Sequence, residues 1–323
     1  FQLVNIAEEN HRLRRKRYYE ALPGFHPQRG SLEDVVHRLQ QAGVPLTTLL
    51  RQAEQLSVNL VLTAHPTQAL PPTVLMKHRR IWDILLPREQ LPPTPKEDAA
   101  LVQELFEEIL GLWQTDELRP TRPTVEDEVE HGLFYLSSVL YEALPDTLQA
   151  FQQEVARVYG RRVPPLPMLR FGSWIGGDKD GNPNVTHQTL RWALGRYRQA
   201  ILAKYLESLE QLRERLTQSS QLCRMPPAFL RSLANDRRGL PALTESLDRQ
   251  FPQQPYRQKL TLMMHRLRQT LRHPTSSDGG YGGVEEFARD VRLIQRSLAA
   301  HHAEALAHHA LEKLTLQIAL FGF

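Results

Sequence analysis

The sequence has almost no cysteine, no long apolar run and little net charge, and each of these absences excludes a class of protein. Cys223 is the only cysteine among 323 residues, which excludes an intrachain disulfide and a cysteine-rich zinc site. No stretch approaches the roughly 20 apolar residues of a membrane helix. Lysine and arginine total 40 against 36 acidic residues, and the net charge of +4 is small for a dedicated nucleic-acid binder. The composition therefore predicts a cytoplasmic protein with neither nucleic acid nor a membrane as its partner.

Both ends of the sequence are unusual. It begins at Phe1, without methionine, and it closes on the apolar stretch LTLQIALFGF. A domain rarely exposes Leu320, Phe321 and Phe323 together. We therefore expect the sequence to be a piece of a longer protein.

Most of the sequence has the periodicity of amphipathic helices. Thr124 precedes Asp127 by three residues, which predicts a capped helix that continues to about Ala143. Thr186 predicts the cap of a long helix that ends near Leu216. The inward side of this long helix is predicted to carry Leu190, Ala193, Leu194, Tyr197, Ala200, Ile201 and Tyr205. Further helices are predicted at 32–39, 101–112, 226–235, 255–272, 284–299 and 303–320.

Strand patterns are few, and they comprise 58–64, 167–175 and, as a third candidate, the last residues. The first one reads VNLVLTAHPTQ, Val58 to Gln68. Pro66 has no amide hydrogen and biases His65 toward an extended conformation, so the strand should stop there. His65 would then lie at the carboxyl end of a strand, where active-site groups gather in parallel α/β proteins.

The second strand pattern leads directly into an unusual loop, LRFGSWIGGDKDGNPNVT, Leu169 to Thr186. Its paired glycines permit close backbone approach, and its alternating charges suit an anionic ligand or a buried ionic network. A calcium loop is excluded, because Pro183 stands where glycine is needed and Thr189 where glutamate is needed. A structural turn held by side-chain caps remains an alternative and, for this loop alone, the commoner case. The sequence does not determine whether the two loops lie on one face.

Together, the two loops resemble the N-terminal signature blocks of phosphoenolpyruvate carboxylase. The resemblance extends to FQLVNIAEENHRLRR at the start, to 112–133 and to 282–298, in the order found in that family. It implies a mainly α protein, with many helices around a few parallel strands of an incomplete (β/α)8-type barrel. It further implies the conversion of phosphoenolpyruvate and bicarbonate to oxaloacetate and phosphate, through carboxyphosphate and an enolate.

The resemblance also assigns roles to individual residues. His65 matches the essential histidine of the family, and a histidine can move a proton near neutral pH. We expect it to take the proton of carboxyphosphate. Trp174 matches a tryptophan of the apolar pocket that retains carbon dioxide. The polar loop is expected to support the site rather than to transfer protons, through Gly176, Gly177, Asp178, Lys179, Asp180 and Asn182.

The resemblance implies further components outside the sequence. The cofactor is expected to be Mg²⁺ or Mn²⁺, with no metal ligand in this chain and all ligands in the C-terminal half of the enzyme. The chain is accordingly interpreted as the N-terminal portion, inactive alone, of an enzyme that is a homo-tetramer when complete. Its expected regions are N-terminal helices (1–57), the two strands with their loops (58–190) and a helical region (191–323).

Several residues depart from the family pattern. Gln68 replaces a glutamate, and Pro71 with Pro72 replaces a basic pair, whereas Lys77 and Arg80 keep the next turn basic. Lys179 replaces an arginine and loses the guanidinium fork. A noncatalytic helical scaffold that retains the carboxylase fold is therefore a second hypothesis.

Two groups of charged or ligating residues are interpreted as surface features. The run HRLRRKR, 11–17, is expected to form a solvated or salt-bridged helix face rather than a nucleic-acid or membrane patch. The pairs His301-His302 and His308-His309 lie about 10 Å apart along a helix, too far apart to share one metal ion. They are expected to be surface histidines.

Overall fold

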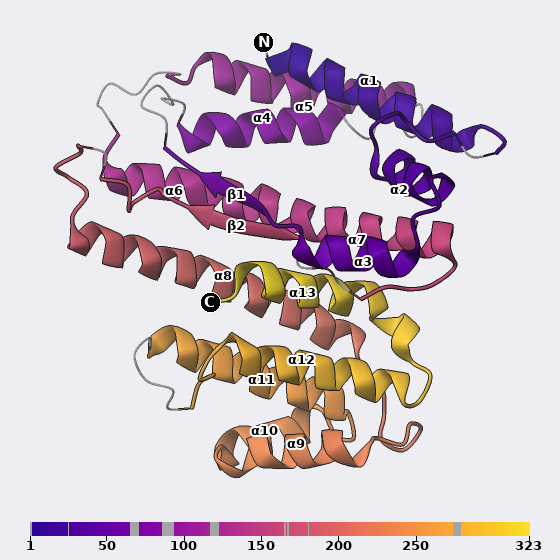
Figure 1. Ribbon diagram of the computed structural model, residues 1–323. Coiled ribbons are helices and arrows are strands. Elements are labelled where there is room, and N and C mark those ends of the chain that lie inside the picture. Colours follow the sequence, from indigo (N-terminus) through magenta and orange to yellow (C-terminus); the bar gives the residue numbers. More distant parts are fainter. Residues whose placement is uncertain are drawn as a thin grey trace.

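The computed structural model describes residues 2–24, 26–64, 71–85, 94–116, 123–164, 166, 168–179, 181–273 and 279–323. These residues form a stack of helices around one pair of strands (Figure 1). The N-terminal part comprises α1 (Gln2–Ala21), α2 (Leu32–Gln41), α3 (Leu46–Gln55), β1 (Val58–Leu62), α4 (Pro72–Leu85) and α5 (Pro95–Trp113). The middle part comprises α6 (Val125–Tyr135), a π-helical segment (Leu136–Leu140), α7 (Tyr141–Tyr159), β2 (Leu169–Ser173) and α8 (His187–Arg215). The C-terminal part comprises α9 (Pro227–Arg238), α10 (Pro241–Gln250), α11 (Pro255–Arg272), α12 (Val284–Ala299), a 3₁₀ turn (Glu304–Leu306) and α13 (His308–Phe321).

The strands β1 and β2 pair in parallel, from Val58 opposite Leu169 to Leu62 opposite Ser173. The predicted strands 58–64 and 167–175 and the mainly helical class are thereby confirmed. The third candidate strand is wrong, because α13 continues to Phe321 and leaves only two residues after it. No other strand lies within the described ranges.

Threonine caps begin the two predicted helices where expected. The Thr124 and Thr186 hydroxyls accept the backbone amides of Asp127 and Thr189, and each helix start has a reciprocal capping box. The predicted end at Ala143 is wrong, because helical structure continues to Tyr159 through the π-helical segment and past Pro145. Pro145 is buried inside α7, where a proline removes one hydrogen bond of the helix.

The main core lies between α8, α9, α11, α12 and α13. Its largest fully buried apolar side chains include Tyr205, Phe229, Tyr256 and Phe287. The inward side predicted for α8 is confirmed at Ala193 and Tyr205, which are completely buried. It is wrong at Leu190 and Leu194, which are 42% and 58% exposed, because the first half of α8 packs mainly on α6 and leaves its other flank uncovered.

The chain exposes much more surface than a compact protein of its mass. It exposes 20,185 Å² at 37.2 kDa, whereas a folded monomer of that mass exposes about 13,700 Å². Apolar side chains contribute to the excess, and on α5 they form a stripe in which Trp113 is 87% exposed. The stripe consists of Val102, Phe106, Ile109, Leu110 and Trp113. Most of both faces of β1 is also exposed.

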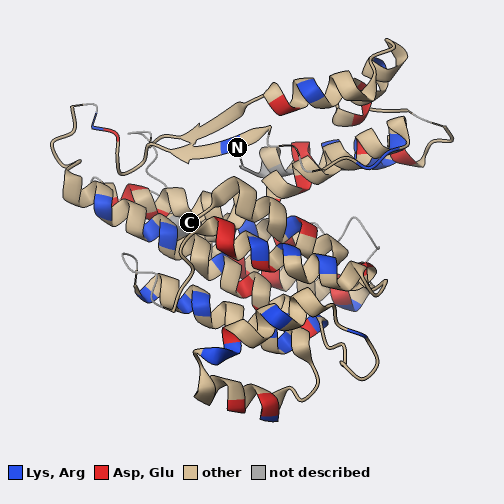
Figure 2. Cartoon of the chain, turned by 60° about the horizontal axis from the view of Figure 1, so that its bottom comes forward, with Lys and Arg blue, Asp and Glu red and all other residues tan. Residues whose placement is uncertain are grey.

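Charged residues are interspersed over the helices (Figure 2). On α1, Arg12 pairs with Glu8 and Glu9, and Lys16 pairs with Glu20. The prediction of a solvated or salt-bridged face on this helix is therefore confirmed. Among the described helices, none combines the length and the apolar character that a membrane crossing requires.

Candidate functional site

The carboxyl ends of β1 and β2 lie side by side, so the loops that follow them leave the sheet at one edge. Leu62 and Ser173 are paired at the ends of the strands, and the Trp174 amide donates to the Leu62 carbonyl at 2.8 Å. Both strands point the same way in Figure 1. The structure thus answers what the sequence left open: both loops begin at the same edge. His65 itself lies outside the described residues.

A ring of hydrogen bonds holds the turn that follows β2. The Tyr197 hydroxyl of α8 donates to the Ile175 carbonyl at 2.8 Å and lies 3.1 Å from the Ser173 hydroxyl. The Ser173 hydroxyl in turn accepts the Ile175 amide at 3.2 Å. Burial raises the pKa of Tyr197, so its hydroxyl is protonated and can donate at neutral pH. Ile175 is buried between α6 and α8 with Val129, Leu133 and Ala193.

Gly176 completes the turn at a position where only glycine fits. Its φ is +82°, and a Cβ there would lie 2.7 Å from Ala193 Cβ and 2.8 Å from Val129 Cγ2. The left-handed conformation disfavours every L-residue, and the contacts leave no space for a methyl group. Gly176 therefore lets the backbone of the turn pack directly against α6 and α8.

Gly176→Ala is expected to lower the free energy of unfolding by about 2–5 kcal/mol, roughly 1–2 from the left-handed conformation and roughly 1–3 from overpacking. Gly160→Ala is the matched control, because Gly160 has φ +70° with nothing near its would-be Cβ, and only the first contribution of about 1–2 kcal/mol applies. Urea unfolding followed by circular dichroism measures both. Equal losses in the two variants would contradict the close packing at Gly176.

The remaining loop residues are more exposed. Trp174 is 57% exposed, and Asp178 and Lys179 are exposed as well, so the buried ionic network considered for this loop is wrong at these two positions. The Asn182 side-chain oxygen accepts the Asn184 amide at 3.0 Å, as in a structural turn. Gly177 is the last residue of the turn, and its amide donates to the Trp174 carbonyl at 2.9 Å. Asp180 lies outside the described residues.

The residues near β1 that depart from the family pattern, and the basic residues that follow them, have identifiable structural roles. Pro72 begins α4, a position that suits proline because the first amide of a helix needs no partner. Lys77 and Arg80 both pair with Glu108 of α5, at 3.4 Å and 3.2 Å. One carboxylate between α4 and α5 offsets part of the charge of these two cations, and the turn keeps a net positive charge, as expected. Gln68 lies outside the described residues.

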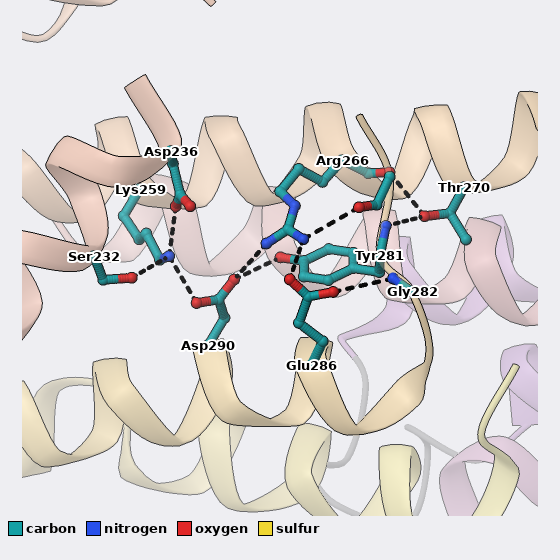
Figure 3. Close-up of polar contacts among 10 residues, drawn as sticks. Ser232, Asp236, Lys259, Arg266, Thr270, Tyr281, Gly282, Glu286 and Asp290 are labelled. Carbon is teal, nitrogen blue, oxygen red and sulfur yellow. Dashed lines mark hydrogen bonds and ion pairs between the residues drawn. The ribbon is translucent and has the colours of Figure 1, made fainter. Parts of the chain in front are cut away.

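A second polar cluster joins α9, α11 and α12, and the sequence reasoning missed it (Figure 3). Lys259 is completely buried and donates to Asp290 at 2.7 Å, Asp236 at 2.5 Å and Ser232 at 2.9 Å. Burial raises the pKa of Asp236 although Lys259 opposes the shift. The signal available in the sequence was a lysine within the apolar stretch KLTLMM of a helix, because a lysine in such a stretch is buried only with partners.

The same cluster fixes the glycine-rich turn before α12. Arg266 binds the Gly280 carbonyl at 3.1 Å, pairs with Glu286, and stacks over Tyr281 with 4.0 Å from its guanidinium carbon to the ring centroid. The Tyr281 hydroxyl donates to Asp290 at 2.9 Å, and its amide donates to Thr270 at 2.7 Å. These polar groups satisfy one another, so the cluster is a tertiary clamp rather than a binding site.

Metal-ligating groups do not gather in the described part of the chain. No three histidine, cysteine, aspartate or glutamate side chains there are arranged to hold an ion. Of the histidine pairs, His308 bonds Glu312 at 3.2 Å. His301 is not simply a surface residue, because its Nε2 lies 2.8 Å from the hydroxyl of the buried Tyr256.

The geometry defines a mainly helical protein in which two parallel strands end at one edge, where the polar loop after β2 begins, as in α/β enzymes. The sequence model of the phosphoenolpyruvate carboxylase family matches residues 1–323, and the chain belongs to this family. It is 36% identical to a phosphoenolpyruvate carboxylase of Xanthomonas campestris pv. campestris and 37% identical to one of Rhodothermus marinus, over its full length and 35% of each relative. Against a phosphoenolpyruvate carboxylase of Roseiflexus castenholzii the identity is 34%, over the full chain and 36% of the relative. The resemblance seen in the sequence is confirmed, and the chain spans about a third of the length of these relatives.

Proposed function

We propose that the chain is the N-terminal portion of a phosphoenolpyruvate carboxylase, which forms oxaloacetate and phosphate from phosphoenolpyruvate and bicarbonate. The observation that carries this proposal is the shared edge of β1 and β2, joined by the bond from Trp174 to Leu62. That edge brings the start of the His65 loop beside the start of the Gly176-Gly177 loop. A catalytic site requires such a convergence, whereas a scaffold does not.

The proposed chemistry needs a general base and an apolar pocket that excludes water. Bicarbonate takes the phosphoryl group of phosphoenolpyruvate, which gives carboxyphosphate and the enolate of pyruvate. His65 takes the carboxyl proton of carboxyphosphate, which then breaks into carbon dioxide and phosphate. The enolate carbon forms a bond to carbon dioxide and yields oxaloacetate. The exposed indole of Trp174 is suited to line the apolar pocket that retains carbon dioxide, because carbon dioxide is apolar and is easily lost to water.

The polar loop has a supporting role in this proposal. Gly176 and Gly177 set the path of the backbone, and Asn182 closes the turn that leads into α8. Asp178 and Lys179 are exposed at the start of the loop, where they can face whatever covers this edge in the complete enzyme. With Asp180, they are proposed to support the site electrostatically rather than to transfer a proton.

Mg²⁺ or Mn²⁺ is the proposed cofactor, and its charge would offset that of the phosphate and the enolate. The described residues of this edge do not fit a metal centre by themselves, since no suitable group of three ligands is found among them. We therefore place the metal ligands in the part of the relatives that this chain does not cover.

We further propose that β1 and β2 are two strands of a (β/α)8-type barrel. Their parallel pairing supports this proposal, as does the exposure of β1 on both faces, because barrel strands are covered on both sides. The chain exposes several thousand Å² more than a compact monomer of its mass. This excess is several times the area of a standard protein–protein interface, about 1,600 Å². The remaining two thirds of the relatives' length would cover it in a cytoplasmic homo-tetramer.

A noncatalytic scaffold is the second candidate. The observation that favours it is the use of Lys77 and Arg80 in ion pairs with Glu108, next to prolines where the family has basic residues. Cations held in this way contribute less to the binding of phosphate or bicarbonate.

Oxaloacetate formation separates the two candidates. The complete enzyme and the 323-residue chain are each supplied with phosphoenolpyruvate, bicarbonate and Mg²⁺. We expect oxaloacetate from the complete enzyme and none from the chain alone. Activity of the chain alone would refute the placement of essential groups elsewhere, and an inactive complete enzyme would favour the scaffold.

A further inference from the structure

Tyr197 lies on α8, outside both signature loops, yet its hydroxyl bonds to the turn that carries Trp174. We propose that Tyr197 is a positioning residue for the retention of carbon dioxide, acting through Ser173 and Ile175 on the orientation of Trp174. This inference rests on the proposed carboxylase function, which it extends by a residue that controls the fate of the enolate.

The hydrogen-bond ring has one consistent arrangement of protons. Tyr197 has a single hydroxyl proton, which it donates to the Ile175 carbonyl. The Ser173 hydroxyl therefore donates to the Tyr197 oxygen and accepts the Ile175 amide. Each hydroxyl both donates and accepts, so the ring is closed. It fixes the amide and the carbonyl of Ile175, and with them the peptide groups on either side of this residue.

Trp174 lies between the two residues that the ring holds. Its own amide is bonded to the Leu62 carbonyl at 2.8 Å. Because 57% of its surface is exposed, little packing orients the indole, and its position follows from the backbone beneath it. The ring at Tyr197 thus adds hydrogen bonds from α8 to the residues on either side of Trp174, beside the packing of Ile175 and Gly176 on Ala193.

The Tyr197 side chain packs on the cluster of Val129, Leu133, Ile175 and Ala193, but part of it also borders open space. A pocket of about 560 Å³ lies there, lined by Phe171, Ser173, Tyr197, Leu194, Leu133 and Phe321 among others. A tyrosine that borders open space is restrained by its hydroxyl more than one enclosed by a close-packed core. Loss of the hydroxyl would free the Ile175 carbonyl and let the turn shift.

The proposed reaction offers a direct readout of that shift. Phosphate is released whether or not the carbon–carbon bond forms. If carbon dioxide stays, the enolate carbon attacks it and gives oxaloacetate. If carbon dioxide escapes, the enolate carbon takes a proton instead and gives pyruvate. The ratio of oxaloacetate to phosphate therefore reports retention of carbon dioxide, independently of how fast phosphate is released.

The test uses Tyr197→Phe in the complete enzyme, with oxaloacetate, pyruvate and phosphate measured in the same samples. We expect one oxaloacetate per phosphate in the unchanged enzyme and at least a halving of that ratio in the variant, because small displacements of a positioned group have large effects. Phosphate release and the KM for phosphoenolpyruvate should change little. Ser173→Ala, which opens the same ring at another point, should shift the ratio in the same direction.

Tyr256→Phe is the matched control. It removes a tyrosine hydroxyl from a buried network, where the hydroxyl lies 2.7 Å from Ser297 and 2.8 Å from His301, in the core between α9, α11 and α12. Its ratio should equal that of the unchanged enzyme. An unchanged ratio in Tyr197→Phe and Ser173→Ala, or an equal fall in Tyr256→Phe, would overturn the proposal. An unchanged enzyme that forms no oxaloacetate would instead overturn the proposed function.

Discussion

The complete enzyme with His65→Asn is expected to form oxaloacetate about 10²–10⁴-fold more slowly, the usual loss when a positioned general base is removed. Asparagine preserves much of the size of the side chain and can still donate a hydrogen bond. It cannot take a proton near neutral pH, so carboxyphosphate would keep its carboxyl proton and break down slowly. Initial rates of oxaloacetate formation at saturating phosphoenolpyruvate and bicarbonate measure the loss.

His187→Asn is the matched control for this substitution. His187 is exposed and begins α8, directly after the polar loop that follows β2. It has no proposed part in proton transfer. Its variant should retain nearly full activity. Full activity in His65→Asn, or a comparable loss in His187→Asn, would remove the assignment of His65 as the base.

Lys259→Met is expected to lower the free energy of unfolding by about 3–5 kcal/mol, the usual loss when one partner of a buried ion pair is removed. Methionine keeps the apolar stem but withdraws three hydrogen bonds, and it leaves Asp236 and Asp290 facing each other across the gap between α9 and α12. Burial already raises the pKa of Asp236, so the loss of the cation would favour its protonated form further.

Lys16→Met gives the comparison at the surface. Lys16 forms an exposed pair with Glu20 at 3.7 Å on α1, and such pairs contribute within about 0.5 kcal/mol. Urea unfolding of both variants at neutral pH measures the difference. If Lys259→Met were as mild as Lys16→Met, the clamp in Figure 3 would have no net role in stability.

The helices could largely be predicted because their signals are local. Thr124 and Thr186 cap helices through side chains three residues away, and the predicted helices at 255–272 and 284–299 match α11 and α12. Errors arose where distant contacts decide the outcome. Helical structure continues past the buried Pro145, and Leu194 is exposed because no other element of the described residues covers its flank.

The candidate site could be predicted only in part, since its geometry depends on pairing across the chain. The sequence indicated two strands and the polar loops after them, but not that Leu62 and Ser173 would be neighbours. The support from Tyr197 was also missed, since an apolar helix position is normally read as core. The ion pair of Lys77 with Glu108 depends on how α4 and α5 meet, which no local pattern specifies.

The pairing of β1 with β2 has a consequence for how the chain folds. Val58 and Leu169 are partners although more than a hundred residues separate them in the sequence, and closing a flexible segment of that length requires roughly 4 kcal/mol of chain entropy. Contacts between residues so far apart in the sequence form slowly, after local helices have shortened the path between the two ends. Pulsed hydrogen exchange during refolding would then find the amides of β2 protected after those of α8. The edge that carries both loops would be assembled last, when the helices on which it rests are already in place.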